Sequence, residues 1–335
     1  MAQLVKLQDY ISRYEIDLTR YPTQFIRLKK GQWERVRENW ERGDEIPQTW
    51  EHFEAEEETE KPKFRLLKKF FKSKKTLEEP LEEDIESVDT SSELDDAGYM
   101  PDQEAMLHFE ANIVYKPQTI YELKRMFMDQ FFHFQVKWAS STVREKSYVD
   151  PKYMRDTLLR SFLQTLPDNY LVFYYPILKL KKAPIELDIV VMTPTECICI
   201  TVLEHEEQAV YIGSADRFWT KKVGKYDKKV LNPLIQLNRM ETILMQLFAQ
   251  DEIDMPIRKV LLSRNGYIDY PGNLYGTHFI DKRKYAAWHE QFKRSSSPLK
   301  HMQIRAAQSI LNYVQTTSFS RDIWTADEQD EKEEN

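Results

Sequence analysis

The chain has 335 residues, of which 41% are hydrophobic and 13% aromatic, and this suffices for about two domains with a substantial core. It has only 8 glycines and no glycine-rich phosphate loop, which excludes the common nucleotide-binding motifs. The net charge of −7 is unevenly spread, because residues 76–105 hold 12 acidic and no basic residues, and residues 327–335 hold 6 acidic residues and one lysine. The remaining chain has 47 basic and 37 acidic residues, a net charge of +10 that favours an anionic partner.

The first predicted element is helical and covers residues 3–42. Pro22 interrupts this pattern and is expected to start a second helix. Two interpretations of residues 1–42 stay open: an arm that binds a protein partner through a coiled coil, or amphipathic helices that pack on their own chain. The apolar side chains recur at alternating spacings of three and four, as in a heptad seam: Leu4, Leu7, Ile11, Tyr14, Leu18, Tyr21, Phe25 and Leu28.

Residues 43–105 are expected to form a charged, largely disordered linker. Within it, residues 61–75 read KPKFRLLKKFFKSKK and carry eight basic residues, with Phe64, Leu67 and Phe71 at helical spacing. One interpretation is weak contact with an anionic membrane surface or with nucleic acid. The other is a self-neutralising linker, because acidic runs flank the basic stretch on both sides.

The rest of the chain predicts alternating helices and strands. Residues 106–149 are expected to form a helical extension around an aromatic-rich helix at 118–138, and a further helix follows at 150–167. The order then predicts a mixed sheet with helices on its faces. We expect strands at 170–180, 185–193, 196–203 and 208–212, a basic loop at 218–229, a helix near 231–248, strands at 258–263 and 277–280, C-terminal helices within 282–320 and an acidic tail at 321–335.

Neither a membrane span nor a disulfide is expected. No apolar run approaches the roughly 18 residues that cross a bilayer, and the N-terminus is amphipathic instead of carrying the apolar region of a signal peptide. Cys197 and Cys199 lie two residues apart on one predicted strand, too far to bridge easily, and are interpreted as buried residues in a reducing compartment. A cytoplasmic location is therefore expected.

Four motifs occur in order between residues 150 and 281. They are Leu166-Pro167-Asp168-Asn169-Tyr170 before the first strand, IELDIVV at 185–191, CICITV at 197–202, and Trp219 followed by Asn232-Pro233 and Gln236. In this order and spacing the region resembles the nuclease-related domain (NERD) family of the PD-(D/E)xK superfamily. The resemblance implies a bacterial protein with a restriction-endonuclease-like α/β core, to which an N-terminal helical region has been added.

The resemblance also implies a chemistry, which is metal-assisted hydrolysis of phosphodiester bonds. Two carboxylates on adjacent strands would hold Mg²⁺, and a lysine two residues after the second carboxylate would share its strand face and stabilise charge. Asp188 matches the first metal-binding carboxylate of the family, and Gln236 matches its retained glutamine. Asp156 lies where the family has a helix carboxylate, although the preceding glycine is absent.

The second half of the implied site is altered. Thr201 and Leu203 occupy the positions of the glutamate and the lysine, and neither replaces the lost chemistry. Glu186 and Glu204 are candidate substitute ligands, although Glu204 points to the opposite face of a regular strand. The site is therefore interpreted as degenerate, with Asp188 either a locally hydrogen-bonded strand-end carboxylate or a residual metal or phosphate ligand. Mg²⁺ would be needed only if activity remains.

Three functions are weighed on these observations. The favoured one is an inactive nuclease-related protein that binds nucleic acid or acts as an accessory factor in nucleic-acid metabolism. The alternatives are an active metal-dependent nuclease with a rearranged site, and a protein-interaction scaffold that uses the N-terminal helices and the acidic linker. The expected nucleic-acid contacts are lysines of the basic loop: Lys221, Lys222, Lys225, Lys228 and Lys229.

Overall fold

The computed structural model describes most of the chain outside the predicted linker and tail. The predicted linker beyond Gly43, its basic stretch at 61–75 and the acidic tail lie outside the described residues, so the expectations for them stay predictions. In the part of the chain that is described, no helix combines the length and hydropathy that a membrane span requires. The described residues are 1–43, 117–142, 144–180, 183–204, 206–272, 274–293 and 297–320.

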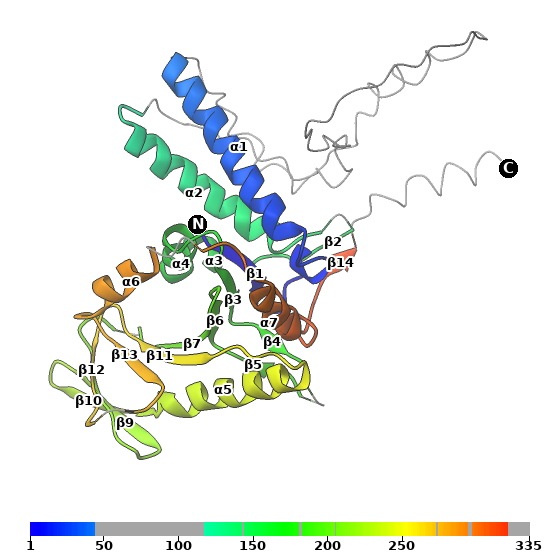
Figure 1. Cartoon of the computed structure of the whole chain (residues 1–335). Helices are drawn as coiled ribbons and strands as arrows, with labels where there is room; N and C mark the ends of the chain where they lie inside the picture. The colour runs from blue at the N-terminus through cyan, green and yellow to red at the C-terminus, as the bar shows by residue number, and fades with distance from the viewer. Residues whose placement is uncertain are drawn as a thin grey trace, which may run out of the picture.

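A six-stranded mixed sheet forms the centre of the molecule, in the order β1-β3-β6-β7-β11-β13 (Figure 1). Neighbouring strands run parallel except at β6, which is antiparallel to both β3 and β7. The parallel strands therefore end at one edge of the sheet, and β6 begins at that edge. The strands are β1 (Gln3–Leu7), β3 (Leu171–Tyr174), β6 (Ile189–Met192), β7 (Cys197–Val202), β11 (Ile257–Leu262) and β13 (Thr277–Ile280).

Helices cover both faces of this sheet, as the predicted α/β fold requires. Helix α5 packs on β7, β11 and α7, whereas α4 approaches α6 through a 2.6 Å contact between Thr165 Oγ1 and His289 Nε2. Figure 1 shows α5 below the strands, and α4 and α6 above them. The helices are α1 (Tyr21–Arg42), α2 (Ile120–Trp138), α3 (Pro151–Arg155), α4 (Thr157–Thr165), α5 (Pro233–Gln250), α6 (Tyr285–Lys293) and α7 (His301–Leu311).

A second sheet has four strands in the order β10-β9-β8-β12. The prediction of a basic loop over 218–229 is wrong, because this segment forms most of the hairpin β9–β10. Alternate residues Trp219 and Lys221 point inward and are buried, and Gly224 adopts a φ of 57° at the turn. The strands are β8 (Val210–Ile212), β9 (Phe218–Val223), β10 (Tyr226–Leu231) and β12 (Tyr267–Asp269).

Two short ribbons complete the described strands. They pair β2 (Glu145–Lys146) with β14 (Phe319–Ser320), and β4 (Ile177–Leu178) with β5 (Ile185–Glu186). The predicted strands at 170–180 and 185–193 are thus each divided into a core strand and a short outer strand. This division places Tyr175 and Asp188 at the breaks.

The N-terminal region differs from the predicted helix over residues 3–42. Residues Gln3–Leu7 form β1, which pairs with β3, and a short 3-10 helix η1 (Arg13–Glu15) follows. Helix α1 begins only at Tyr21, with Pro22 in its first turn as expected. The spacing of Leu4 and Leu7 fits a helix equally well, because a strand buried on both faces has no alternating pattern.

Tertiary partners satisfy the polar residues of β1. The side chain of Gln3 donates to the Asp168 carbonyl over 2.7 Å. The Lys6 ammonium is fully buried and lies 2.5 Å from a carboxylate oxygen of Glu15. Such partners offset the cost of burying an amide and a charge in a strand, and the sequence pattern alone does not contain them.

Helices α1 and α2 pack on one another along an aromatic seam. The ring centroids of Phe25 and Phe131 are 5.3 Å apart, and those of Trp33 and Phe127 are 5.4 Å apart. Both helices extend away from the sheet in Figure 1. This packing matches the interpretation of helices that bury their apolar faces within the chain, and a protein partner for them stays a prediction.

Candidate functional site

Asp188 lies at the sheet edge where the parallel strands end. It directly precedes β6, and the register of β6 with β7 pairs Ile189 with Ile200, which brings Asp188 opposite Thr201. Cross-strand neighbours of this kind share a face of the sheet. The predicted proximity of these two residues is therefore present in the structure.

The Asp188 carboxylate is bound by the residue that occupies the position of the missing second carboxylate. Thr201 Oγ1 donates to Asp188 Oδ2 over 2.5 Å, and Gln236 from the first turn of α5 lowers the pKa of the same carboxylate. Burial raises the pKa of the Asp188 carboxyl, while the hydrogen bond from Thr201 opposes that shift and the charge of Glu186 adds to it. The side-chain amide of Gln236 also donates to the Glu186 carbonyl over 3.3 Å.

Leu203 leaves the implied lysine position apolar. Its side chain is 8% exposed and belongs to the hydrophobic core, and its backbone N–H donates to the Leu262 carbonyl over 2.8 Å. Thr201 is 7% exposed. The edge of β7 thus offers Asp188 one hydroxyl donor and no positive charge.

Glu204 is paired on the other side of the sheet edge. Both oxygens of its carboxylate accept from Arg264, each over 2.6 Å, from Nε and Nη2. The same guanidinium reaches Thr157 at the start of α4, whereas Asp188 and Gln236 lie toward α5. Glu204 consequently points away from Asp188, as expected for a regular strand, and the fork-shaped pairing occupies its oxygens.

Asp156 is a helix cap. It adopts an extended conformation between α3 and α4, so the single helix predicted over 150–167 is broken at this residue. Its Oδ1 accepts from the N–H groups of Leu158 and Leu159, and its Oδ2 accepts from the Tyr174 hydroxyl over 2.7 Å. These bonds stabilise the start of α4.

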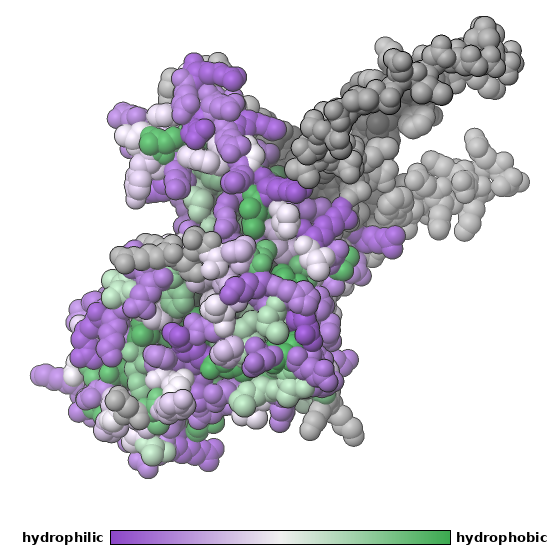
Figure 2. All heavy atoms as spheres, in the orientation of Figure 1, coloured by the Kyte–Doolittle hydropathy of each residue, from purple (hydrophilic) through white to green (hydrophobic). Residues whose placement is uncertain are grey.

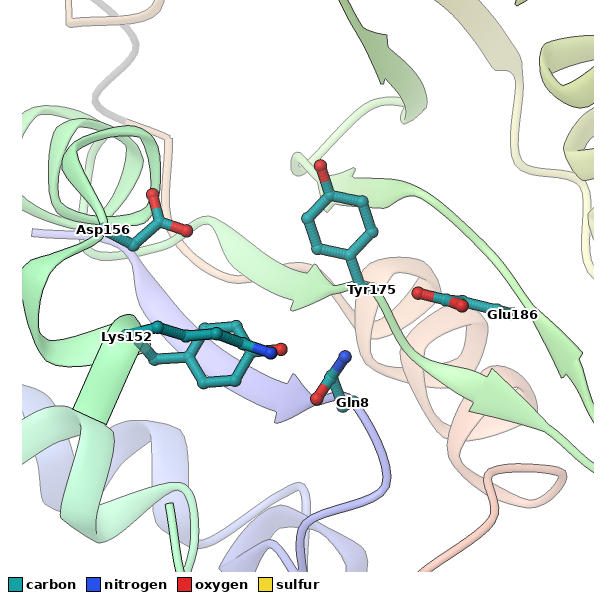
Figure 3. A pocket seen from close by; sticks show the side chains of 6 residues that line it. Gln8, Lys152, Asp156, Tyr175 and Glu186 are labelled. Carbon is teal, nitrogen blue, oxygen red and sulfur yellow. The ribbon is translucent and has the colours of Figure 1, made fainter. Parts of the chain in front are cut away.

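Sequence reasoning missed an open pocket next to these carboxylates (Figure 3). Tyr175 and Gln8 follow the ends of β3 and β1, and both adopt left-handed backbone conformations, with φ of 50° and 45°. Burial and then the charge of Asp188 raise the pKa of the Tyr175 hydroxyl. The pocket has a volume of about 410 Å³ and is lined by Gln8, Lys152, Tyr153, Asp156, Tyr175 and Glu186.

The strain at Tyr175 carries only a weak sequence signal. Pro176 follows it, and a residue before proline is restricted in its backbone conformation. Glu186 reaches this pocket from β5, and Figure 3 shows its carboxylate turned toward Tyr175. The pocket therefore brings two phenols, an amide and the Lys152 ammonium next to the carboxylates of Asp156 and Glu186.

The residues present do not fit a Mg²⁺ site. Among the described residues, no group of three or more His, Cys, Asp or Glu side chains is arranged to hold a metal ion. Asp156 caps a helix, Glu204 pairs with Arg264, and Asp188 accepts from Thr201. A Mg²⁺ site built on two of these three carboxylates would have to displace one of these partners.

The lysines of the hairpin are divided by strand register. Lys221 is buried and forms an ion pair with Glu206 over 2.9 Å, so it is poorly placed to meet a ligand. Lys222 and Lys229 lie on the outer face, Lys228 lies on the opposite face, and Lys225 occupies the turn. These four are exposed.

The Trp219 and Asn232 signature holds a loop in place. Trp219 Nε1 donates to the Ser214 carbonyl over 2.9 Å, and Asn232 Nδ2 donates to the Asp216 carbonyl over 2.8 Å. The other side-chain atom of Asn232, Oδ1, caps α5 by accepting from Leu234 N–H over 3.0 Å. A Cβ at Gly213 would lie 2.9 Å from the Trp219 ring, which explains a glycine at that position.

The mixed sheet and the helices on its faces are consistent with a nuclease-like α/β fold. The family described as "Nuclease-related domain" (NERD) matches residues 153–263, and the resemblance inferred from the motifs is thereby confirmed for this part of the chain. An "RNA 2',3'-cyclic phosphodiesterase" of Geobacillus stearothermophilus is 58% identical over 41 residues, which are 12% of this chain and 13% of that protein. No solved structure matches the chain.

Proposed function

We propose that this nuclease-related domain binds nucleic acid without hydrolysing it. The observation that carries the proposal is the 2.5 Å hydrogen bond from Thr201 to Asp188. It satisfies the remaining carboxylate of the implied metal site with a neutral donor, at the position where the family has a glutamate. Phosphodiester hydrolysis would need a second carboxylate and a cation at this edge.

The lysines of β9–β10 support the binding half of the proposal. Lys222, Lys225, Lys228 and Lys229 are exposed, and each phosphate that a lysine neutralises releases condensed counterions. The hairpin leads directly into α5, whose residue Gln236 lies beside Asp188. A strand bound along the hairpin would therefore approach the altered site.

The test is equilibrium binding of the full chain to labelled DNA and RNA over a range of salt concentrations. We expect affinity to fall steeply with salt, and the variant Lys222→Gln with Lys225→Gln to reduce the slope of log K against log salt by about two. The matched control is Lys221→Gln, which removes an inward-facing lysine and leaves the slope unchanged. Failure to bind DNA or RNA at low salt would overturn the proposal and favour the scaffold function.

A further inference from the structure

An open hollow lies at the base of the hairpin, outside the carboxylate edge. It has a volume of about 520 Å³ and is lined by Asp216, Arg217, Phe218 and Lys229. Phe218 is 49% exposed, so its ring is accessible from the solvent. The Arg217 guanidinium lies 5.7 Å from the centroid of that ring. The hollow thus combines an accessible aromatic face with two cations and one carboxylate.

The register of β9 with β10 places further side chains on the same face as this hollow. Phe218 pairs with Leu231, and Thr220 with Lys229, so these side chains share the outer face of the four-stranded sheet. Lys229 Nζ donates to Thr220 Oγ1 over 3.0 Å, which holds its charge beside the hollow. In Figure 2, small apolar patches lie between hydrophilic ones over the lower body, where Figure 1 places β9, β10 and α5.

The loop that supplies Asp216 and Arg217 is held rigidly. Trp219 and Asn232 bond the carbonyls of Ser214 and Asp216, and the Arg217 carbonyl accepts from the Asn232 N–H over 2.9 Å. The hollow is thereby formed before a ligand arrives. Preorganisation of this kind reduces the entropy cost of binding.

We propose that this hollow binds an unpaired nucleotide, and that the domain prefers single-stranded nucleic acid. The inference rests on the proposed function and deepens it. A base would stack on Phe218, its phosphates would meet Arg217 and Lys229, and Asp216 would accept from an exocyclic amino group. A base within a duplex is stacked on both faces and offers no free face to Phe218.

The occupant follows from the chemistry of the lining. A second copy of this chain would cover the exposed side chains of Phe218 and Leu231. Each copy, however, brings two cations and only one carboxylate to the hollow, so one cation per copy would be desolvated without a counter-charge. A nucleotide supplies both a flat aromatic face and the negative charge. Charge complementarity therefore favours nucleic acid over a second copy.

The test compares a labelled single strand of about 20 nucleotides, mixed in sequence, with the duplex of the same sequence. Fluorescence anisotropy with the full chain should show the single strand bound about tenfold more tightly. Phe218→Ala should weaken single-strand binding about tenfold and leave duplex binding unchanged. The matched control is Tyr226→Ala, because Tyr226 is an exposed ring on the opposite face of the same hairpin, and this variant should bind like the wild type.

Three results would overturn the inference. If strand and duplex bind equally and Phe218→Ala binds like the wild type, the hollow is not a nucleotide site, although the proposed function survives. If neither probe binds at low salt, both the inference and the proposed function fail. If sedimentation shows a dimer that Phe218→Ala dissociates, a second copy of the chain occupies the face.

Discussion

Thr201 and Asp188 face each other across the β6–β7 pair, and the hydroxyl of one donates to the carboxylate of the other over 2.5 Å. In the family that residues 153–263 match, this pair is implied to be two carboxylates that share a metal ion. In this chain the two side chains share a direct hydrogen bond. On the proposed function, substitutions at this pair should change stability.

Thr201→Val should lower stability at neutral pH by about 2 kcal/mol. Valine keeps the shape of threonine but removes the donor, and hydrogen bonds to charged groups contribute about 1.5–3 kcal/mol. Chemical denaturation measures the change. The matched control is Thr201→Ser, which retains the hydroxyl and should lose much less stability. Equal losses in both variants would show that the methyl group, and not the hydrogen bond, is what matters.

Asp188→Asn should stabilise the protein at neutral pH. Because burial raises the pKa of Asp188 above 3.8, the folded state holds this proton more tightly than the unfolded state, and ionisation opposes folding as pH rises. Asparagine removes that cost, so its advantage should be largest near pH 7 and absent below pH 3.8. Thermal melts across this range measure it. An advantage that grows toward acid pH would contradict the assigned direction of the shift.

Arg264→Met should destabilise the chain by about 2 kcal/mol, because it leaves the Glu204 carboxylate partly buried and unpaired. The side chains of Glu204 and Arg264 are 15% and 20% exposed, which places the effect below that of a fully buried pair. The double variant with Glu204→Gln should recover part of the loss. Strictly additive losses in a double-mutant cycle would show that the pair is not coupled.

Asn232→Ala should cost about 2 kcal/mol and also weaken binding of nucleic acid. The side chain caps α5 and holds the Ser214 and Asp216 carbonyls, so alanine removes both functions. Asn232→Ser keeps a capping oxygen but loses the amide donors, and should recover most of the stability and little of the affinity. Denaturation and anisotropy on the same samples separate the two effects. Affinity restored by serine would show that binding does not depend on the amide donors of Asn232 to the loop.

The core of the fold was predictable because its strands are short apolar runs. IELDIVV and CICITV are rich in β-branched residues, and both core strands lie within the predicted ranges. Strand β1 was not predictable, since its partner β3 lies more than 160 residues away and its polar residues Gln3 and Lys6 depend on distant partners. The spacing of neighbouring residues in the sequence indicates neither the pairing with β3 nor these distant partners.

The candidate site was predictable only in part. Motif spacing placed Asp188, Thr201 and Gln236 together, and the structure brings them to one edge. The motif spacing did not indicate that Arg264 would form an ion pair with Glu204, because that contact joins two strand ends that are 60 residues apart. Nor did it indicate the left-handed Tyr175, or the hairpin that separates Lys221 from the exposed lysines, because both depend on tertiary register.

Restoring the implied pair should create a metal site. The variant Thr201→Glu with Leu203→Lys places a carboxylate opposite Asp188 and a cation two residues on, on the same strand face. Electron paramagnetic resonance of Mn²⁺ should show binding that the wild type lacks. Thr201→Glu alone is the control for the cost of burying the lysine. A folded double variant that binds no Mn²⁺ would show that β7 is wrongly aligned with the family motif.

The central claim is most directly tested by incubating the full chain with labelled single-stranded DNA, duplex DNA and RNA in the presence of Mg²⁺ or Mn²⁺. We expect the chain to bind the labelled nucleic acid and to yield no cleavage products. Asp188→Ala should bind like the wild type. Metal-dependent cleavage by the wild type that Asp188→Ala abolishes would contradict the account and establish an active nuclease with a rearranged site.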